Sequence, residues 1–329
     1  MTQDLKNSAS QFAKTSSKVA QAVRIVEVGL RDGLQNEAQF PDAATRRELL
    51  HHMVEAGTKS IEIGAFVSPR WVPAMACSEE LVKSVLADQK NKIISDDIHL
   101  SVLIPNEKGM ETAVKLGVNE VAIFAACSEG FSQKNTNCSI DESFKRLAVV
   151  ARKALSQNIR VRGYLSTCFG CPFEGSVDMS KVAQNVKRML DLGIYEVSLG
   201  DTIGIASAGN VETLLNKLFS FVQPHQLAGH FHDTRGQALV NILKAYEMGI
   251  TTFDSSIGGL GGCPYAPGAT GNVATEDVVF LFNSLNISTG LKLDKLIVIN
   301  RWLSKKMGRS LSSRVGIAGI PDKFKVEVN

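Results

Sequence analysis

Two histidines, His230 and His232, are separated by one residue in a β-rich run of the chain. Alternate residues of a strand point to the same face, so both imidazoles can reach one point. Neutral imidazole is a common metal ligand, although two hydrogen-bonded histidines in a polar pocket would show the same spacing. Asp32 and Asn272, which follow other β-rich runs, can add oxygen ligands. Nitrogen and oxygen donors together with water favour Mg²⁺ or Mn²⁺ over a closed zinc site, and we predict a divalent metal here.

Arg31 stands next to Asp32 and could form only a surface ion pair of little energetic value. Beside a metal, an arginine is better interpreted as a clamp for an oxyanion or a carboxylate. Glu62 lies in another β-rich run, where an unpaired carboxylate pointing inward would cost free energy. We therefore expect Glu62 to pair with Arg31, the alternative being an exposed glutamate.

A glycine-rich stretch at positions 258–272 contains Cys263. Its spacing resembles a dinucleotide-binding motif, but two prolines interrupt it and no strand–turn–helix pattern surrounds it. A mobile flap that carries Cys263 fits better, with a static loop as the alternative. Cys168 and Cys171 form a CxxC motif without the second pair that a zinc site requires, and we expect them to be structural.

Four joints along the chain share one pattern: a helix-periodic stretch ends, a glycine follows, and a short β-rich run begins. The glycines are Gly57, Gly117, Gly193 and Gly249. Glycine there fits the left-handed position just past a helix end. One further strand–helix pair lies between successive joints, and a first strand is expected at 23–28, so the total is eight strand–helix units. Eight units predict a (β/α)8 TIM barrel, with an open doubly wound sheet as the alternative.

The barrel is expected at residues 23–285. Residues 1–22 are predicted to be a partly ordered lead-in, and residues 286–329 a helical extension of the same domain. Within that extension, the Ser- and Lys-rich stretch 304–314 is predicted to be surface or lid.

Barrel chemistry occurs at the C-terminal ends of the strands, so the polar residues there are the candidates. We expect strand 5 to end at Tyr164, strand 6 to end at Asp201 and Thr202, and strand 7 to run through His232.

The composition excludes several classes of partner. The 329 residues include 36 Lys and Arg against 33 Asp and Glu, a net charge of +3, which does not favour nucleic acid or an anionic membrane. No run approaches the ~18 apolar residues of a membrane span. The first 22 residues lack the apolar core of a secretion signal and contain no arginine. Six irregularly spaced cysteines predict reduced thiols and a cytoplasmic location.

Five motifs together resemble the 3-hydroxy-3-methylglutaryl-CoA lyase family, within the metal-dependent barrel lyases that include isopropylmalate and homocitrate synthases. The resemblance covers about residues 23–277, and its motifs lie at 26–37, 66–73, 198–204, 230–234 and 259–272. The cysteine-containing loop favours the lyases. The synthases usually carry a C-terminal regulatory domain, for which this chain has no room.

The resemblance implies a role for each matching residue. It implies that the divalent cation is bound by Asp32, His230, His232 and Asn272. It implies that catalysis involves Arg31, Asp32, Glu62, Asp201, His230 and Cys263, and that the substrate pocket is lined by Arg31, Gln35, Tyr164 and Thr202. The chain departs from the family pattern at Leu30, Gly64, Ala65 and Arg235, so a larger branched 3-hydroxyacyl-CoA is an alternative substrate.

The reaction implied is a retro-aldol (Claisen-type) cleavage to acetoacetate and acetyl-CoA. Asp32 or His230 would take the proton of the C3 hydroxyl, and Arg31 would neutralise the enolate oxygen. A short condensing synthase and a non-catalytic CoA- or metal-binding relative are the alternatives. The expected partner is an acyl-CoA, with no nucleic acid or membrane and a possible homodimer.

Overall fold

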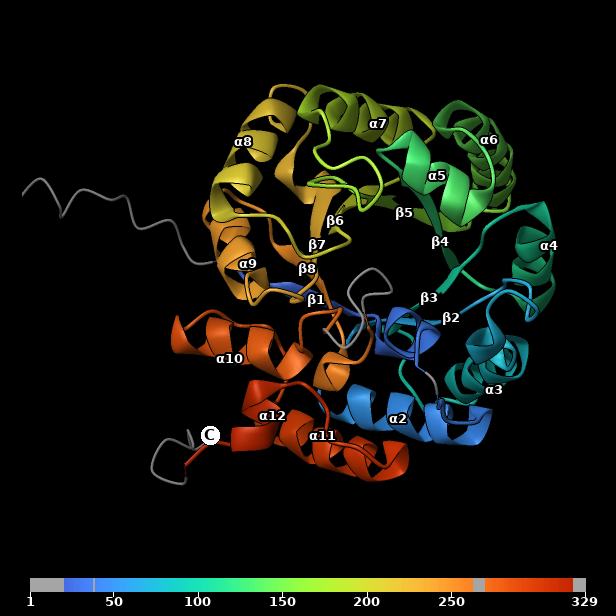
Figure 1. Ribbon diagram of the computed structural model, residues 1–329. Helices are drawn as coiled ribbons and strands as arrows, with labels where there is room; N and C mark the ends of the chain where they lie inside the picture. The colour runs from blue at the N-terminus through green and yellow to red at the C-terminus, as the bar shows by residue number, and fades with distance from the viewer. Residues whose placement is uncertain (1–20, 38, 263–269, 322–329) are drawn as a thin grey trace, which may run out of the picture.

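The computed structural model describes residues 21–37, 39–262 and 270–321, and within them the predicted (β/α)8 barrel is confirmed. Eight parallel strands close into a barrel in sequence order, with β1 paired to both β2 and β8. Figure 1 shows the helices as a ring around the strands. The strands are β1 (Arg24–Glu27), β2 (Ser60–Ala65), β3 (His99–Leu103), β4 (Glu120–Ala126), β5 (Arg160–Ser166), β6 (Glu196–Asp201), β7 (Leu227–Phe231) and β8 (Thr252–Ser255).

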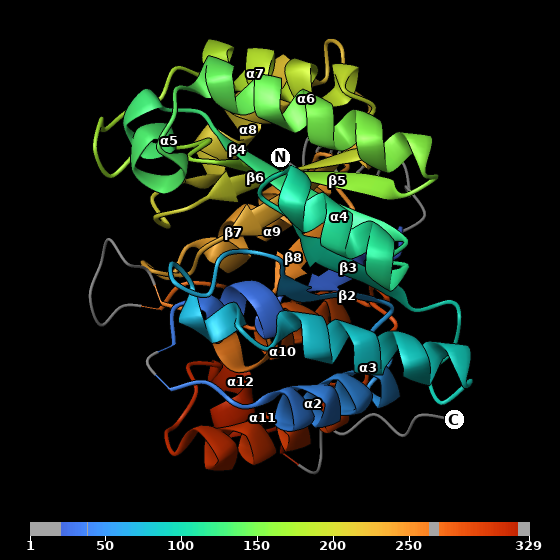
Figure 2. The ribbon, with the colours of Figure 1, turned by 90° about the vertical axis from the view of Figure 1, so that its right-hand side faces the viewer.

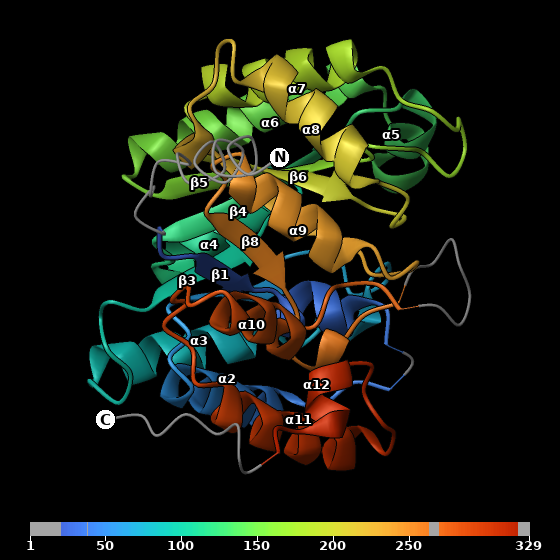
Figure 3. The same cartoon turned by 90° about the vertical axis from the view of Figure 1, so that its left-hand side faces the viewer.

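Each strand is followed by at least one helix that covers the outside of the barrel. The helices are α2 (Ala43–Glu55), α3 (Ser78–Lys90), α4 (Glu107–Leu116), α5 (Glu129–Thr136), α6 (Ile140–Ser156), α7 (Met179–Asp191), α8 (Ala208–Leu218), α9 (Ala238–Glu247) and α10 (Thr275–Ser284). Two further helices, α11 (Leu293–Met307) and α12 (Arg314–Ala318), pack beside α2 and α10, as the side views show (Figures 2 and 3). No helix among the described residues combines the length and hydropathy that a membrane crossing requires.

The glycine joints have the backbone conformation that the sequence predicts. Gly57, Gly117, Gly193 and Gly249 have φ angles of 103°, 77°, 84° and 107°. Only glycine adopts this region at little cost, so each joint ends its helix and returns the chain to the next strand. The barrel is therefore built from one repeated local signal.

Two predicted strand ends are wrong by one or two residues. β5 continues to Ser166, so Tyr164 lies inside the barrel and not at its rim. β7 ends at Phe231, and His232 instead forms an isolated bridge with Asn272. The division between barrel and extension at residue 285 stays a prediction.

Buried carboxylates near the start of α10 fasten the C-terminal segment to the loop after β8. Glu276 accepts a hydrogen bond from the Gly258 amide at 2.9 Å and one from Asn300 Nδ2 at 2.7 Å. Asp277 accepts from Ser313 Oγ and from the Val315 amide, both at 2.8 Å. Ser313 is fully buried, so the prediction that 304–314 is only surface or lid is wrong for this part of the stretch. We call Glu276 and Asp277 the α10 clamp.

A third buried carboxylate, Glu27 at the end of β1, ties the loops after β1 and β8 together. It accepts hydrogen bonds from the amides of Gly29 and Ile257, both at 2.8 Å, and from Thr275 Oγ1 at 2.7 Å. These loops leave the barrel at the end where the predicted site residues lie.

Candidate active site

Asp32, His230 and His232 come together at the C-terminal end of the barrel. Asp32 belongs to a short π-helical turn, Gly29–Gly33, directly after β1, and the histidines come from the end of β7. The Nε2 atoms of the two histidines lie 3.2 Å apart. Asp32 Oδ2 lies 3.8 Å from His230 Nε2. Three potential ligand atoms, one from each side chain, lie within 4.8 Å of one another.

This cluster fits a divalent cation in both geometry and charge. Ligands at about 2.1 Å from an octahedral ion are separated by about 3 Å, close to the distance between the histidine nitrogens. Burial and the neighbouring His230 lower the pKa of His232 to about 4, which keeps that imidazole neutral. Burial raises the pKa of Asp32, but the charges of Arg31 and His230 outweigh it and hold this pKa well below its ordinary value. The carboxylate of Asp32 and the neutral imidazole of His232 are therefore available as ligands. At His230, burial lowers the pKa, but the hydrogen bond and charge of Asp254 outweigh it and raise this pKa above its ordinary value.

Asn272 lies beside this cluster. Its Nδ2 donates a hydrogen bond to Asp32 Oδ2 at 2.8 Å, and its backbone bridges to His232. The amide nitrogen, not the oxygen, faces Asp32, so Asn272 as a metal ligand stays a prediction.

The expected pairing of Arg31 with Glu62 is present and buried. Arg31 Nε donates to Glu62 Oε1, and Arg31 Nη1 contacts Asp32 Oδ1. Arg31 is only 6% exposed and Glu62 is fully buried. Burial raises the pKa of Glu62, and the charge of Arg31 opposes that rise without cancelling it. The guanidinium group thus connects β2 to the ligand cluster.

Polar atoms around the cluster lack hydrogen-bond partners within the described part of the chain. They are Glu62 Oε2, Tyr164 OH and His232 Nδ1. The Tyr164 ring lies 5.3 Å from the Arg31 guanidinium carbon and contacts His230 edge-to-face. Buried polar atoms are normally hydrogen-bonded, so unpaired ones beside the ligand cluster point to a polar ligand.

Other predicted site residues have different surroundings. The carboxylate of Asp201 accepts hydrogen bonds from the Ile205 and Ala206 amides at 2.9 and 3.0 Å, which shapes the loop after β6. Burial raises the pKa of Asp201. Thr202 Oγ1 accepts from the Thr167 amide at 2.8 Å. The roles predicted for Asp201 and Thr202 stay predictions.

Gln35 is half-buried on the segment that follows the π-helical turn. Cys263, with the flap predicted around it, lies outside the described residues. The residues that flank the undescribed 263–269, Gly262 and Thr270, form an antiparallel bridge. Cys168 and Cys171 are both buried, in keeping with a structural role.

Sequence reasoning missed the charged residues inside the barrel below the histidines. Arg162, Glu196 and Asp254, from β5, β6 and β8, are each no more than 2% exposed. One sequence signal could have indicated that Arg162 points into the barrel. It stands two positions before the predicted site residue Tyr164, and alternate residues of a strand share a face.

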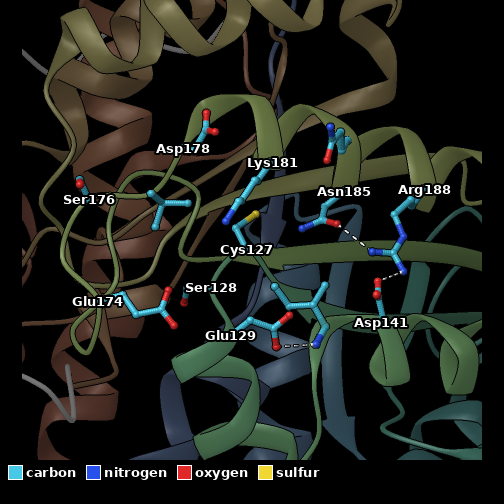
Figure 4. A pocket seen from close by; sticks show the side chains of 13 residues that line it. Cys127, Ser128, Glu129, Asp141, Glu174, Ser176, Asp178, Lys181, Asn185 and Arg188 are labelled. Atoms are coloured by element: carbon cyan, nitrogen blue, oxygen red, sulfur yellow. Dashed lines mark hydrogen bonds and ion pairs between the residues drawn. The ribbon is translucent and has the colours of Figure 1, made fainter.

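A cavity of about 290 Å³ lies outside the barrel, between α5, α6, α7 and the loop after β5. Figure 4 shows Glu129 and Glu174 across this cavity from Lys181, with Cys127 between them. None of the predicted site residues that the structure describes lines it, so this cavity is separate from the Asp32, His230 and His232 cluster.

Comparison with known proteins identifies one family. The model of the HMGL-like family matches residues 22–303. The mitochondrial hydroxymethylglutaryl-CoA lyase of Arabidopsis thaliana is 48% identical, over 93% of this chain and 64% of the plant protein, so the chain spans less than two thirds of that relative. A 3-hydroxy-3-isohexenylglutaryl-CoA/hydroxy-methylglutaryl-CoA lyase of Pseudomonas aeruginosa is 48% identical, over 90% of this chain and 96% of the relative. A lyase of Rattus norvegicus that is named as cytoplasmic is 43% identical, over 94% of this chain and 88% of the relative.

Solved structures lead to the same family. The hydroxymethylglutaryl-CoA lyase structure from Pseudomonas aeruginosa is 47% identical, with a TM-score of 0.87 over 91% of this chain and 97% of that chain. Another lyase structure, in complex with coenzyme A and 3-methylmalate, is 34% identical. Its TM-score is 0.86, over 93% of this chain and 98% of that chain.

Proposed function

The chain belongs to the HMGL-like family, and we propose that it cleaves 3-hydroxy-3-methylglutaryl-CoA to acetoacetate and acetyl-CoA with a divalent metal. One observation carries the proposal: the Asp32, His230 and His232 cluster lies directly beside the buried Arg31–Glu62 pair. Relatives at 48% identity that are named for this cleavage support it, as does the related lyase structure that contains coenzyme A.

The cluster would hold the cation through Asp32, His230 and His232, with Asn272 as a further ligand. A bound Mg²⁺ or Mn²⁺ would act as a Lewis acid on the C3 oxygen of the substrate and lower the pKa of its hydroxyl group. Asp32 or His230 would accept the hydroxyl proton, and His230 could do so only where its Nε2 is not bound to the cation. Loss of this proton forms the acetoacetate carbonyl as the C2–C3 bond breaks, and the bonding electrons pass to the thioester as an enolate.

Arg31 is placed to neutralise the enolate oxygen. Its guanidinium is held by Glu62, which thereby orients the positive charge. A preorganised donor of this kind contributes roughly 3–4 kcal/mol to the transition state. Tyr164 OH, which has no protein partner among the described residues, is a candidate donor to a polar group of the substrate. Cys263 or His230 would return a proton to C2.

The acyl group of the substrate is the second question. The Pseudomonas aeruginosa relative is named for both an isohexenyl-substituted and a methyl-substituted substrate. We therefore propose a larger branched 3-hydroxyacyl-CoA as the alternative substrate. The relatives favour cleavage over condensation.

The decisive experiment measures acetyl-CoA and acetoacetate release from a panel of branched 3-hydroxyacyl-CoA thioesters. We expect cleavage of the methylglutaryl substrate to stop after chelation and to return with Mg²⁺ or Mn²⁺. Full activity in protein shown to be metal-free by elemental analysis would overturn metal dependence. No cleavage of any thioester, with condensation of acetyl-CoA and a keto acid instead, would overturn the reaction.

Cys263 is tested separately as the proton donor. A thiol with an ordinary pKa of ~8.5 is mostly protonated at neutral pH, whereas a serine hydroxyl is a far weaker acid. We expect Cys263→Ser to bind metal and substrate nearly normally but to turn over about a hundredfold more slowly. Alkylation should inactivate the enzyme and substrate should protect it, with modified residues mapped by mass spectrometry. Full turnover by Cys263→Ser would assign the proton donor to His230.

A cytoplasmic location and a homodimer complete the proposal. One relative is named as cytoplasmic and another as mitochondrial, so fractionation of the source cells decides the first point. Light scattering of the purified protein decides the second.

A further inference from the structure

The imidazole of His230 rests on a buried carboxylate inside the barrel. Asp254, on β8, places Oδ2 3.1 Å from His230 Nδ1. The same oxygen accepts a hydrogen bond from Ser198 Oγ at 2.6 Å, and Asp254 Oδ1 accepts one from Arg162 Nη2 at 2.8 Å. The side chain of Asp254 is fully buried, so these partners determine its orientation.

The hydrogen-bond donors and acceptors determine where the proton of His230 lies. An ionised carboxylate can only accept hydrogen bonds, so His230 Nδ1 must be the donor. A neutral imidazole carries a single N–H, and therefore Nε2 of His230 keeps its lone pair. Nε2 is the atom that faces His232 Nε2 and Asp32 Oδ2.

We propose that Asp254 is a positioning residue that holds His230 as the Nδ1–H tautomer and thereby keeps its Nε2 lone pair directed at the candidate metal site. This inference rests on the metal proposed above and assigns the support of one ligand. Carboxylates that orient metal-binding histidines in this way influence metal affinity although they do not touch the ion.

The ion pairs that hold Asp254 continue across the barrel interior. Arg162, whose Nη2 binds Asp254, also donates from Nε to Glu196 Oε1 at 2.7 Å. Arg24, at the opposite end of the barrel, pairs with the second oxygen of Glu196. Arg162 thus stands between two carboxylates, of which only Asp254 contacts a histidine.

Within the described part of the chain, no carboxylate supports His232 in this way. Its Nδ1 is buried without a hydrogen-bond partner among the described residues. The two histidines therefore differ. Asp254 fixes the tautomer of His230 through Nδ1, whereas the tautomer of His232 depends on the group that binds its Nε2.

Asp254→Asn tests the proposal. The amide oxygen of the variant should turn to the Arg162 guanidinium, because a charge-assisted hydrogen bond is the stronger one. Its NH2 group would then face His230 Nδ1 and force the proton onto Nε2, where it blocks the lone pair. We expect Mn²⁺ to bind about 10- to 100-fold more weakly, as measured by titration calorimetry. The ¹⁵N NMR signals of His230 in alkaline buffer, assigned with a His230→Gln protein, should show the proton moving from Nδ1 to Nε2.

Glu196→Gln is the matched control. It removes the other carboxylate from Arg162 and is equally buried, but it leaves the contact between Asp254 and His230 in place. We expect this variant to keep the Mn²⁺ affinity and the Nδ1–H tautomer, even if both variants lose stability in urea.

Three results would overturn the inference. One is an Asp254→Asn protein with unchanged affinity and tautomer, and another is an equal loss of affinity in both variants without any change of tautomer. The third needs no variant: wild-type His230 as the Nε2–H form. Failure of the wild-type protein to bind Mn²⁺ would instead overturn the proposed metal, and the NMR tautomer would still decide the role of Asp254.

Discussion

Buried carboxylates occur in two regions of this molecule, and their partners differ. Near the candidate metal site, Asp32 and Asp254 face the guanidinium groups of Arg31 and Arg162. Beneath the loop after β8, the donors to Glu27 and Glu276 that the described residues supply are all neutral N–H and O–H groups. Asp254, Glu27 and Glu276 are all at most 2% exposed, so the contrast among them lies in the charge of the partner.

The acidity of the two regions follows from these partners. Burial raises the pKa of Asp254, but the Arg162 charge and the His230 hydrogen bond outweigh it and bring this pKa to about 2. Burial dominates at Glu27 and Glu276 and raises their pKa values to about 7 and about 8. The arginine charges thus keep Asp32 and Asp254 ionised, although burial still raises the pKa of Glu62. Glu27 and Glu276, by contrast, serve as hydrogen-bond acceptors in a structural frame.

Replacing Arg31 with glutamine should give the largest effect, because it removes the charged partner from the site. Turnover should fall at least roughly a hundredfold, the effect of a lost oxyanion donor of about 3 kcal/mol. Arg31 is buried, so the change also leaves Glu62 without its counter-charge, and we expect a loss of stability of roughly 3–5 kcal/mol. Wild-type turnover in Arg31→Gln would show that the clamp is misassigned.

The double variant Arg31→Gln/Glu62→Gln separates the two effects. Removing both charges should restore much of the stability in urea unfolding, because the fully buried Glu62 no longer carries a charge without a partner. Turnover should stay low. If turnover recovered together with stability, the role of Arg31 would be structural.

Asp277→Ala should produce the reverse pattern, with an effect mainly on stability. It leaves the Ser313 hydroxyl and the first amides of α12 without an acceptor, which should cost about 2 kcal/mol in urea unfolding. Metal affinity should be unchanged, because Asp277 does not contact the ligand cluster. A variant as stable as wild type but unable to bind Mn²⁺ would contradict the contrast between the regions.

The pH dependence of stability should come from the buried carboxylates under the loop after β8. The folded-state pKa of Glu276 is about 8, above its ordinary value of 4.5, so the folded protein binds the extra proton. Its contribution is fully present below pH 4.5 and is lost as the pH rises through about 8. We expect urea unfolding of Glu276→Gln to show a flatter decline over this range than wild type. An identical decline in both proteins would place the titration elsewhere.

The fold was accessible from sequence because its signal is local and repeated. A helix that ends at Gly57 or Gly193 and is followed by a strand can be recognised without knowing any distant contact. The ligand cluster was accessible for a related reason: the alternation of His230 and His232 and the placement of Asp32 after a strand identify one barrel end.

The support beneath the cluster was not accessible in this way. Asp254 contacts Arg162, Ser198 and His230, which lie on three other strands, so the set depends on registers that no local pattern encodes. A charged residue within a short strand can equally face solvent. Asp201 shows a different difficulty. Its position at a strand end predicts a catalytic role, but a carboxylate there can instead accept hydrogen bonds from the backbone of its own loop, as Asp201 does from Ile205 and Ala206.

The α10 clamp has a consequence for how the protein is made. The amides of Ser312 and Ser313 donate to the carbonyl of Gly258, and Asp277 holds the same segment from below. These residues come late in the chain, after the last strand, which pairs with the first in the closed barrel. During translation the barrel can therefore close before the loop at its catalytic end is secured. A chain that ended within α11 would contain Asp32, His230 and His232 but would lack Ser312 and Ser313, whose amides secure the loop after β8.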